Sequence, residues 1–372
     1  MSSKLKLATI LGTRPEIIRL SAVIKLAERV FDHTLVHTGQ NYAYTLNQIL
    51  FEDLDLRTPD HYLNAVGDDL GATIGNIIAK SYKLLSEMRP DAVLILGDTN
   101  SALAAISAKR LKIPVFHMEA GNRCFDENLP EELNRRIVDH ISDVNLPYSE
   151  QARRNLIAEG IKKEYIFVTG SPMREVLQSR RASDILSRLE LASQNYILLS
   201  VHREENIDIE HNFYELIGAI NALATQYNMP VLYSVHPRSQ KAIDSHEVKF
   251  HPLVRMHEPF GFSDYIELQQ NAFCVVSDSG TLAEESAILG FPAVSARTST
   301  ERQEAIDRGG MVIGGIGETA IRQAVELATR LKDAPHSDVL DYADTNVSVK
   351  VCKIIQGYTD VINRMIWRKQ ER

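Results

Sequence analysis

Residues 91–106 read DAVLILGDTNSALAAI and set a pattern that repeats along the chain. The apolar run Ala92–Leu96 is typical of a buried strand, Gly97–Asn100 of a polar turn, and a helical pattern begins near Ser101. A strand followed by a helix is the unit of a parallel sheet whose faces are covered by helices. We therefore expect an α/β protein.

The same alternation occurs in two sets, one in each half of the chain. The first set comprises Leu5–Leu11, Thr34–Thr38, Ala92–Leu96, Val115–Met118, Val144–Pro147 and Ile166–Val168. The second set comprises Tyr196–Ser200, Val231–Ser234, Val254–Met256, Cys274–Ser277, Ala293–Ser295 and Met311–Ile313. Two doubly wound, Rossmann-like domains follow from this pattern, with the active site expected in the cleft that the strand C-termini face.

A polar, apolar-poor stretch near Met173 predicts the joint between the domains. The first domain is then expected to cover residues 1–172 and the second domain residues 173–356. A long helical pattern at Val347–Trp367 follows the second sheet, and we expect the end of the chain, residues 357–372, to return to the first domain.

Composition excludes several classes of protein. The chain has 372 residues, of which 44% are hydrophobic and 24% charged, as in ordinary globular proteins. No apolar run approaches the ~18 residues of a membrane-spanning helix, so we expect a cytoplasmic protein without a membrane partner. A net charge of −8 argues against a nucleic acid partner. Cys124, Cys274 and Cys352 lack metal-binding spacing and predict no metal site.

Carboxylates stand directly after two of the predicted strands. Asp98 follows the strand that ends at Leu96, and Glu119 follows the strand that ends at Met118. Asp98 alone would be explained as a helix N-cap. Several carboxylates gathered at one edge of a sheet repel one another, so we interpret them as groups for general acid–base catalysis.

A third carboxylate of this set, Glu131, lies with Glu132 in the first turn of a predicted helix that begins at Pro130. Their interaction with the helix dipole contributes only a few tenths of a kcal/mol. We expect Leu133, Ile137 and Ile141 to form the inward face of this helix.

Candidate anion-binding groups also follow predicted strands. Arg14 lies in the turn Gly12–Glu16, where free helix amides and a guanidinium suit a phosphate, although an ordinary helix start with a surface arginine explains the pattern equally well. His202 and Arg203 follow one strand of the second half, and His236 follows the next. A lone histidine is more often a core residue, but two beside arginines at successive strand ends favour an anionic ligand.

The segment Ser277–Thr281 leads from a strand into a helix. The hydroxyl of Ser279, the small Gly280 and the free helix amides form a candidate diphosphate site. Glu285, in the first turn of that helix, suits the hydroxyls of a ribose, and Arg302 lies on a following polar loop.

One apparent cofactor motif is rejected. Gly315–Ala320 fits the G-x-G-x-x-A pattern of dinucleotide-binding proteins, but no predicted strand follows its helix. The βαβ unit is therefore incomplete, and we expect neither NAD nor another cofactor.

Six motifs, in order along the chain, resemble those of the non-hydrolysing UDP-N-acetylglucosamine 2-epimerase family. They are G-T-R-P-E at 12–16, G-D-T at 97–99, E-A-G at 119–121, P-E-E-x-N-R at 130–135, H-R-x-E at 202–205 and D-S-G-x-x-x-E-E at 278–285. The resemblance implies a glycosyltransferase-B-like fold and a UDP-2-acetamido sugar substrate, and we also expect a homodimer. It implies phosphate binding at Arg14, acid–base roles for Asp98, Glu119 and Glu131, an active-site role for His202, diphosphate binding at Ser279 and Gly280, and ribose binding at Glu285.

Within that family, His117–Asp126 and the opening G-T-R-P-E-I-I-R-L-S look closer to the UDP-N-acetyl-L-fucosamine synthases of capsule and O-antigen biosynthesis. Gln40-Asn41-Tyr42 and Ser279-Gly280-Thr281 replace the Q-H-R and S-G-G of the N-acetylglucosamine enzymes, and the loop Gly121–Pro130 is shorter. These differences argue against UDP-N-acetylglucosamine as substrate and against its allosteric activation. UDP-N-acetylglucosamine 2-epimerisation remains the alternative function. A hydrolysing epimerase is a closer rival than a glycosyltransferase of the same fold, and a non-catalytic nucleotide-sugar sensor is a rival from a different class.

Overall fold

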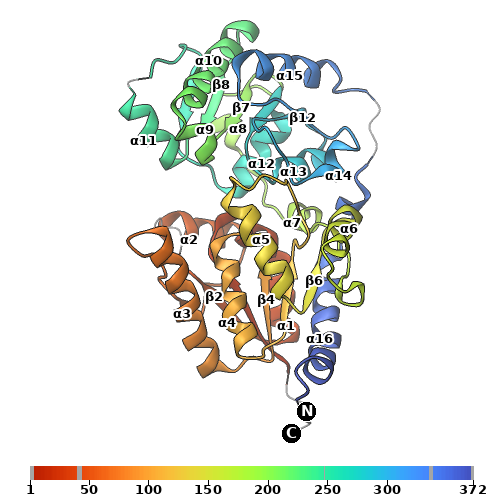
Figure 1. Cartoon of the computed structure of the whole chain (residues 1–372). Coiled ribbons are helices and arrows are strands. Elements are labelled where there is room, and N and C mark those ends of the chain that lie inside the picture. Colours follow the sequence, from red (N-terminus) through yellow and green to blue (C-terminus); the bar gives the residue numbers. More distant parts are fainter. Residues whose placement is uncertain (1–3, 40–43, 247, 335–337, 370–372) are drawn as a thin grey trace. The chain divides into compact units, whose positions relative to one another are not determined.

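The computed structural model describes residues 4–39, 44–246, 248–334 and 338–369. The chain forms two compact units (Figure 1), namely unit 1, Met1–Ser179 with Leu340–Arg372, and unit 2, Arg180–Val339. These boundaries differ from the expected domains, 1–172 with 357–372 and 173–356. The reason is a set of hydrogen bonds that joins residues 171–175 to the last part of the chain, such as Arg174 Nε to the carbonyl of Tyr342 at 3.1 Å.

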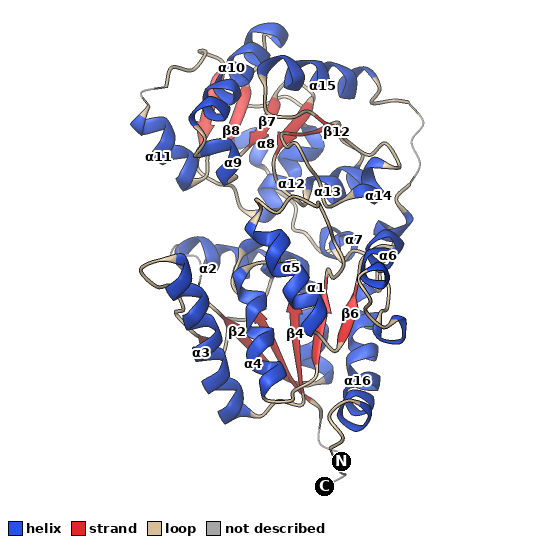
Figure 2. Ribbon diagram, viewed as in Figure 1, coloured by secondary structure: helices blue, strands red, loops and turns tan. Residues whose placement is uncertain are grey.

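Unit 1 contains a parallel six-stranded sheet in the order β3-β2-β1-β4-β5-β6 (Figure 2). Its strands are β1 (Lys6–Leu11), β2 (Asp32–His37), β3 (His61–Tyr62), β4 (Ala92–Leu96), β5 (Val115–Met118) and β6 (Val144–Leu146). The order reverses between β1 and β4, which is the switch point of a doubly wound sheet, where such folds bind ligands.

The helices of unit 1 cover this sheet. They are α1 (Arg14–Val30), α2 (Tyr44–Asp53), α3 (Leu70–Met88), α4 (Ala104–Arg110), α5 (Pro130–Ile141), α6 (Glu150–Ala158), α7 (Met173–Gln178) and α16 (Val347–Met365). The last helix, α16, packs against the first, α1, and both belong to unit 1.

Unit 2 repeats the topology, with sheet order β12-β11-β10-β7-β8-β9. Its strands are β7 (Ile197–Ser200), β8 (Val231–Ser234), β9 (Val254–His257), β10 (Cys274–Ser277), β11 (Ala293–Ser295) and β12 (Val312–Ile313). Its helices are α8 (Ile185–Arg188), α9 (Glu204–Ile207), α10 (Glu210–Tyr227), α11 (Pro237–Ser245), α12 (Phe262–Asn271), α13 (Leu282–Leu289), α14 (Gln303–Ile306) and α15 (Glu318–Arg330). The predicted pair of doubly wound α/β sheets is confirmed.

Two local predictions are wrong, and one strand was missed. Ile166–Val168 forms only an isolated bridge, between Ile166 and Asn145, and the two-residue strand β3 was not predicted. On α5, Leu133 is 62% exposed and Ile137 36% exposed, because this helix buries Glu132, Asn134, Arg135, Val138 and Asp139 instead. A largely polar set of residues therefore forms the buried face of α5, while Leu133 and Ile137 of the expected inward face are exposed.

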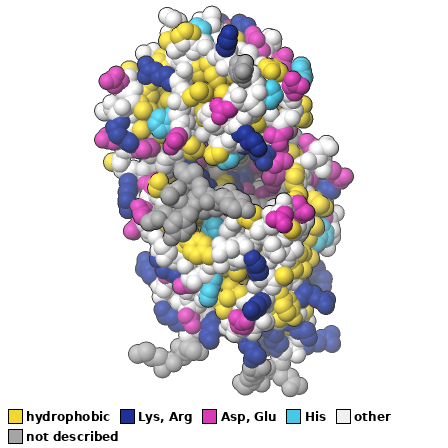
Figure 3. Space-filling view, turned by 90° about the vertical axis from the view of Figure 1, so that its left-hand side faces the viewer, with side chains coloured by type: hydrophobic (Ala, Val, Ile, Leu, Met, Phe, Trp, Pro, Cys, Tyr) yellow, Lys and Arg dark blue, Asp and Glu magenta, His cyan; other side chains and the backbone are white. Residues whose placement is uncertain are grey.

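The surface carries charge of both signs. Figure 3 shows acidic and basic side chains distributed over the face that it draws. Within the described ranges, no helix combines the length and apolar character needed to cross a membrane.

Candidate active site

The carboxylates of unit 1 lie where adjacent strands end. The pairing of β4 with β5 places Leu96 beside Met118, so the residues that follow them leave the sheet at the same edge. Asp98 and Glu119 therefore lie close together in the fold, although 20 residues separate them in the sequence. The turn Gly12–Glu16 leaves the same edge after β1.

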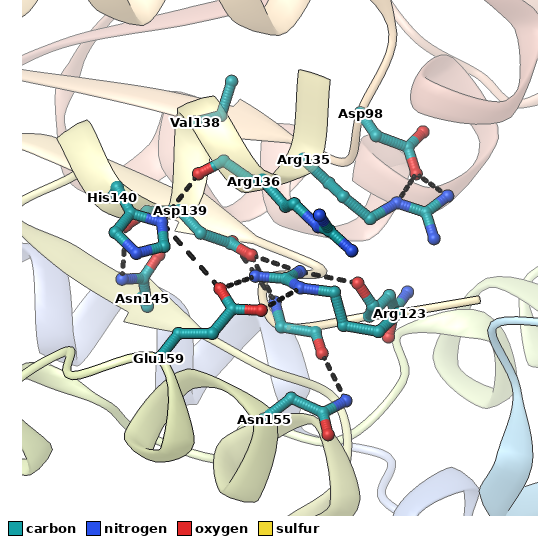
Figure 4. Close-up of polar contacts among 12 residues, drawn as sticks. Asp98, Arg123, Arg135, Arg136, Val138, Asp139, His140, Asn145, Asn155 and Glu159 are labelled. Atoms are coloured by element: carbon teal, nitrogen blue, oxygen red, sulfur yellow. Dashed lines mark hydrogen bonds and ion pairs between the residues drawn. The ribbon is translucent and has the colours of Figure 1, made fainter. Parts of the chain in front are cut away.

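Asp98 is held by helix α5. Arg135 contacts its Oδ2 through Nε at 3.0 Å and Nη2 at 2.7 Å (Figure 4), while the side-chain amide of Asn134 donates to its carbonyl at 3.0 Å. The Asp98 side chain nevertheless stays 22% exposed. It is thus oriented by a guanidinium and still accessible to a ligand.

Glu119 has a strained backbone and a buried cationic partner. Its φ is +63°, in the left-handed region that few non-glycine residues adopt. Arg19 of α1 contacts both carboxylate oxygens through Nη1, at 2.8 and 2.7 Å, and only 7% of Glu119 is exposed. Sequence reasoning missed Arg19, although an arginine on the buried face of α1, between Ile17 and Ile24, is a visible signal.

Glu131 and Glu132 have different surroundings. Glu132 is buried and accepts hydrogen bonds from the backbone N–H of Cys124 at 3.2 Å and from Arg135 at 3.0 Å, so it ties the preceding loop to α5. Glu131, in the same turn, stays partly exposed. Of the two, Glu131 is the carboxylate that a ligand can reach.

The Gly12–Glu16 turn is organised by Glu16. Its Oε2 accepts from the backbone N–H of Gly12 at 3.1 Å and from the N–H and hydroxyl of Thr13, both at 2.8 Å. Burial raises the pKa of Glu16 to about 7, although these hydrogen bonds lower it. A Cβ on Gly12 would lie 1.9 Å from the Thr38 hydroxyl, so only glycine fits there. Arg14 is partly exposed at the first position of α1.

In unit 2, Asp278 organises the corresponding strand ends. It follows β10 and is fully buried. Its Oδ2 accepts from the backbone N–H groups of His202 at 2.9 Å and Arg203 at 2.8 Å, and from the amide of Asn206 at 2.9 Å. Asp278 therefore holds the turn after β7 in the position that presents His202, whose side chain is 40% exposed.

His202 and His236 lie together at the ends of the neighbouring strands β7 and β8. Their ring centroids are 5.2 Å apart, and His236 caps α11 by accepting from the backbone N–H of Arg238. Arg203 also donates through Nε to the carbonyl of Asp278 at 3.1 Å. Two imidazoles at neighbouring strand ends suit an anionic group.

The turn after Asp278 is closely packed. The hydroxyls of Ser279 and Thr281 lie 3.0 Å apart, and a Cβ on Gly280 would lie 2.8 Å from Oε1 of Glu301. Glu285 is buried and accepts from the amide of Gln269 at 2.7 Å.

The predicted substrate-binding residue Arg302 is buried and paired within unit 2. Arg302 is 1% exposed and forms an ion pair with the buried Glu284 at 3.1 Å, so its guanidinium lies against α13. Gln40-Asn41-Tyr42 lies outside the described residues. In the described part of the chain, no group of three or more His, Cys, Asp or Glu side chains is arranged to hold a metal ion.

Comparisons with known proteins point to one family. The family model described as UDP-N-acetylglucosamine 2-epimerase matches residues 25–356. The UDP-N-acetylglucosamine 2-epimerase of Methanocaldococcus jannaschii is 35% identical over 341 residues, covering 88% of this chain and 93% of that protein. The UDP-2,3-diacetamido-2,3-dideoxy-D-glucuronate 2-epimerase of Pseudomonas aeruginosa is 33% identical, covering 85% and 90%.

Solved structures of UDP-N-acetylglucosamine 2-epimerases are similar to this chain in fold. The structure of the UDP-N-acetylglucosamine 2-epimerase from Rickettsia bellii has a TM-score of 0.91 at 44% identity and covers 98% of this chain and 100% of that one. The Methanocaldococcus jannaschii enzyme, solved in complex with UDP-GlcNAc and UDP, has a TM-score of 0.89 at 32% identity and covers 95% and 100%.

Proposed function

Because the chain belongs to the UDP-N-acetylglucosamine 2-epimerase family and is a UDP-sugar 2-epimerase, we propose that it inverts C2 of UDP-2-acetamido-2,6-dideoxy-L-talose and makes UDP-N-acetyl-L-fucosamine. The observation that carries the acid–base part of this proposal is the pair of oriented carboxylates, Asp98 and Glu119, at adjacent strand ends of unit 1. Arg135 holds Asp98 and Arg19 holds Glu119. Glu131 lies in the first turn of α5, the helix that also carries Arg135.

Inversion at this carbon is difficult because its proton is not acidic. In the proposed route a carboxylate removes the C2 proton, the electrons of the C–H bond form a C1–C2 double bond, and the C1–O bond breaks so that UDP leaves with its electron pair. A second carboxyl group, which is protonated before this step, then delivers its proton to the opposite face of C2 while an oxygen of UDP bonds again to C1. The first group ends protonated and the second ends ionised. Atoms and charge balance without any redox partner.

Departing UDP carries the developing negative charge. In unit 2, the exposed His202 with its neighbour His236, the Ser279–Gly280 turn and the first turn of α13 are suited to stabilise a diphosphate. Glu285 is proposed to accept from the ribose hydroxyls. Retention of the 2-acetamidoglycal, rather than its release, would distinguish a non-hydrolysing enzyme from a hydrolysing one.

The substrate is the finer part of the proposal. Support comes from the stretch His117–Asp126 and the opening motif, which look like the fucosamine branch. Relatives named for UDP-N-acetylglucosamine and for a diacetamido glucuronate share the family, so one scaffold serves several UDP-2-acetamido sugars. UDP-N-acetylglucosamine is the alternative substrate.

The test is to incubate the protein in D₂O with each of the two UDP sugars and to follow C2 by NMR, with no NAD added. We expect inversion at C2 with deuterium incorporated into product and recovered substrate, and a higher kcat/KM for the 6-deoxy-L sugar. Retention of the original C2 hydrogen would contradict the elimination route. A higher kcat/KM for UDP-N-acetylglucosamine would select the alternative substrate, and accumulation of UDP with free sugar would indicate hydrolysis.

A further inference from the structure

A buried polar network lies beneath the strand ends that carry Asp98 and Glu119. It comprises His117 on β5, Arg123 in the loop between β5 and α5, Asp139 on α5 and Glu159 after α6, of which Figure 4 labels the last three. The side chains of His117, Arg123 and Asp139 are fully buried. None of the three belongs to the set assigned above to the chemistry.

His117 connects the two carboxylate-bearing turns. Its Nε2 lies 2.8 Å from the carbonyl of Gly97, the residue immediately before Asp98, and its Nδ1 lies 3.0 Å from Oδ1 of Asp139. Since a carbonyl only accepts, Nε2–H donates to Gly97. Glu119 directly follows the strand that carries His117, so His117 contacts the Asp98 turn and lies two residues before Glu119.

Asp139 fixes the other side of the Glu119 turn. Its carboxylate accepts from the backbone N–H of Gly121 at 3.1 and 3.2 Å. Glu119 and Gly121 both have positive φ, +63° and +81°. A non-glycine residue in this region costs on the order of 1–3 kcal/mol and persists only where its surroundings hold it.

Arg123 compensates the buried negative charge. It donates through Nη1 to Asp139 at 2.7 Å, and through Nε and Nη2 to Glu159 at 2.7 and 2.6 Å. A buried ion network of this kind contributes little to stability compared with an apolar core of equal volume. Its placement against both turns favours a role in orientation.

We propose that His117 and Asp139 are positioning residues that act through Asp98 and Glu119. The inference rests on the proposed epimerase function. His117 sets the Asp98 turn through Gly97, and Asp139 holds the Glu119 turn through Gly121 and orients His117.

The test compares Asp139→Asn with Asp143→Asn in the full-length protein. Asp143 is a matched control, because it is also a buried carboxylate just beyond α5 but contacts the N–H of Val115, at the opposite end of β5, at 3.0 Å. We expect Asp139→Asn to lower kcat by ~10-fold or more, with UDP affinity and the KM of the sugar nucleotide within ~3-fold of wild type. Asp143→Asn should change the unfolding midpoint without lowering kcat per UDP-binding site.

A second pair of variants keeps the proposal testable if Asp139→Asn does not fold. Gln at position 117 can retain a donor toward Gly97, so His117→Gln should keep a larger share of kcat than His117→Ala. Equal kcat in Asp139→Asn and Asp143→Asn, or equal kcat in the two His117 variants, contradicts the positioning role alone. Lack of C2 inversion by the wild type with every UDP-2-acetamido sugar contradicts the proposed function and the assignment that rests on it.

Discussion

At the residue scale, the ionisation of Glu16 at neutral pH destabilises the folded state. Its pKa, about 7 in the folded chain against 4.5 for an ordinary glutamate, means that the native state holds a proton that the unfolded state has lost. The contribution of Glu16 to the free energy of unfolding therefore falls as pH rises from 4.5 to 7, by about 3 kcal/mol.

Glu16→Gln should remove this dependence. We expect the stability of Glu16→Gln relative to wild type to increase between pH 4.5 and pH 8, as measured by urea unfolding at both values. Glu150→Gln, at an exposed site in the first turn of α6, is the control. Parallel pH dependence of wild type and Glu16→Gln would show that Glu16 does not hold this proton.

The three proposed acid–base carboxylates give a second residue-scale prediction. Asp98→Asn, Glu119→Gln and Glu131→Gln should each lower kcat by ~10²-fold or more, because an amide cannot transfer the proton. Glu119→Gln should also lower the unfolding midpoint, since it leaves Arg19 buried without its carboxylate partner. Near-normal kcat in all three variants would mean that the chemistry lies elsewhere.

At the element scale, strand β2 holds two neutral histidines. The pKa of His33 and of His37 is lowered to about 4. Burial is the main cause for both, and the nearby Arg57 is a second cause for His33. In the unfolded chain both protonate near pH 6.5. The contribution of these two histidines to the free energy of unfolding is thus fully present above pH 6.5 and is lost as pH falls toward 4.

We expect the double variant His33→Gln/His37→Gln to lose less stability than wild type between pH 6.5 and pH 4.5. The difference should be on the order of 2 kcal/mol per histidine, read from urea unfolding at the two pH values. His211→Gln, on the outer surface of α10, is the control and should follow the wild type. Identical losses in the double variant and wild type would refute buried, neutral rings.

Some features of the helices and strands could be predicted from the sequence, and others could not. Apolar runs predicted the strands that carry Asp98, Glu119 and Asp278, because a strand buried on both faces must be apolar throughout. Periodicity failed on α5, because ion pairs rather than apolar contacts fill the space beneath it. The Arg19–Glu119 pair joins residues 100 positions apart, and nothing local in the sequence specifies such a pairing.

At the scale of the whole molecule, one strand topology is used twice with different chemistry at the strand ends. Unit 1 places carboxylates there, held by Arg19 and Arg135, whereas unit 2 places His202, His236 and a hydroxyl-rich turn. The repeated topology could be predicted from the alternation of strands and helices. The different chemistry could be predicted only from the residues that follow each strand.

This contrast predicts a division of labour between acid–base residues in unit 1 and nucleotide-binding residues in unit 2. Glu285→Ala should raise the Kd of UDP by ~10-fold or more, since a charged hydrogen-bond acceptor contributes about 1.5–3 kcal/mol. Asp98→Asn should lower kcat and leave that Kd unchanged.

Glu326→Ala, which removes an exposed ion pair with Arg330 on α15, is the control for Glu285→Ala. Calorimetric titration with UDP measures the Kd of each of the three variants. Their unfolding midpoints are measured first, to establish that each variant is folded. If Asp98→Asn weakens UDP binding as much as Glu285→Ala does, the carboxylate of unit 1 contributes to nucleotide affinity and the two roles are not divided between the units.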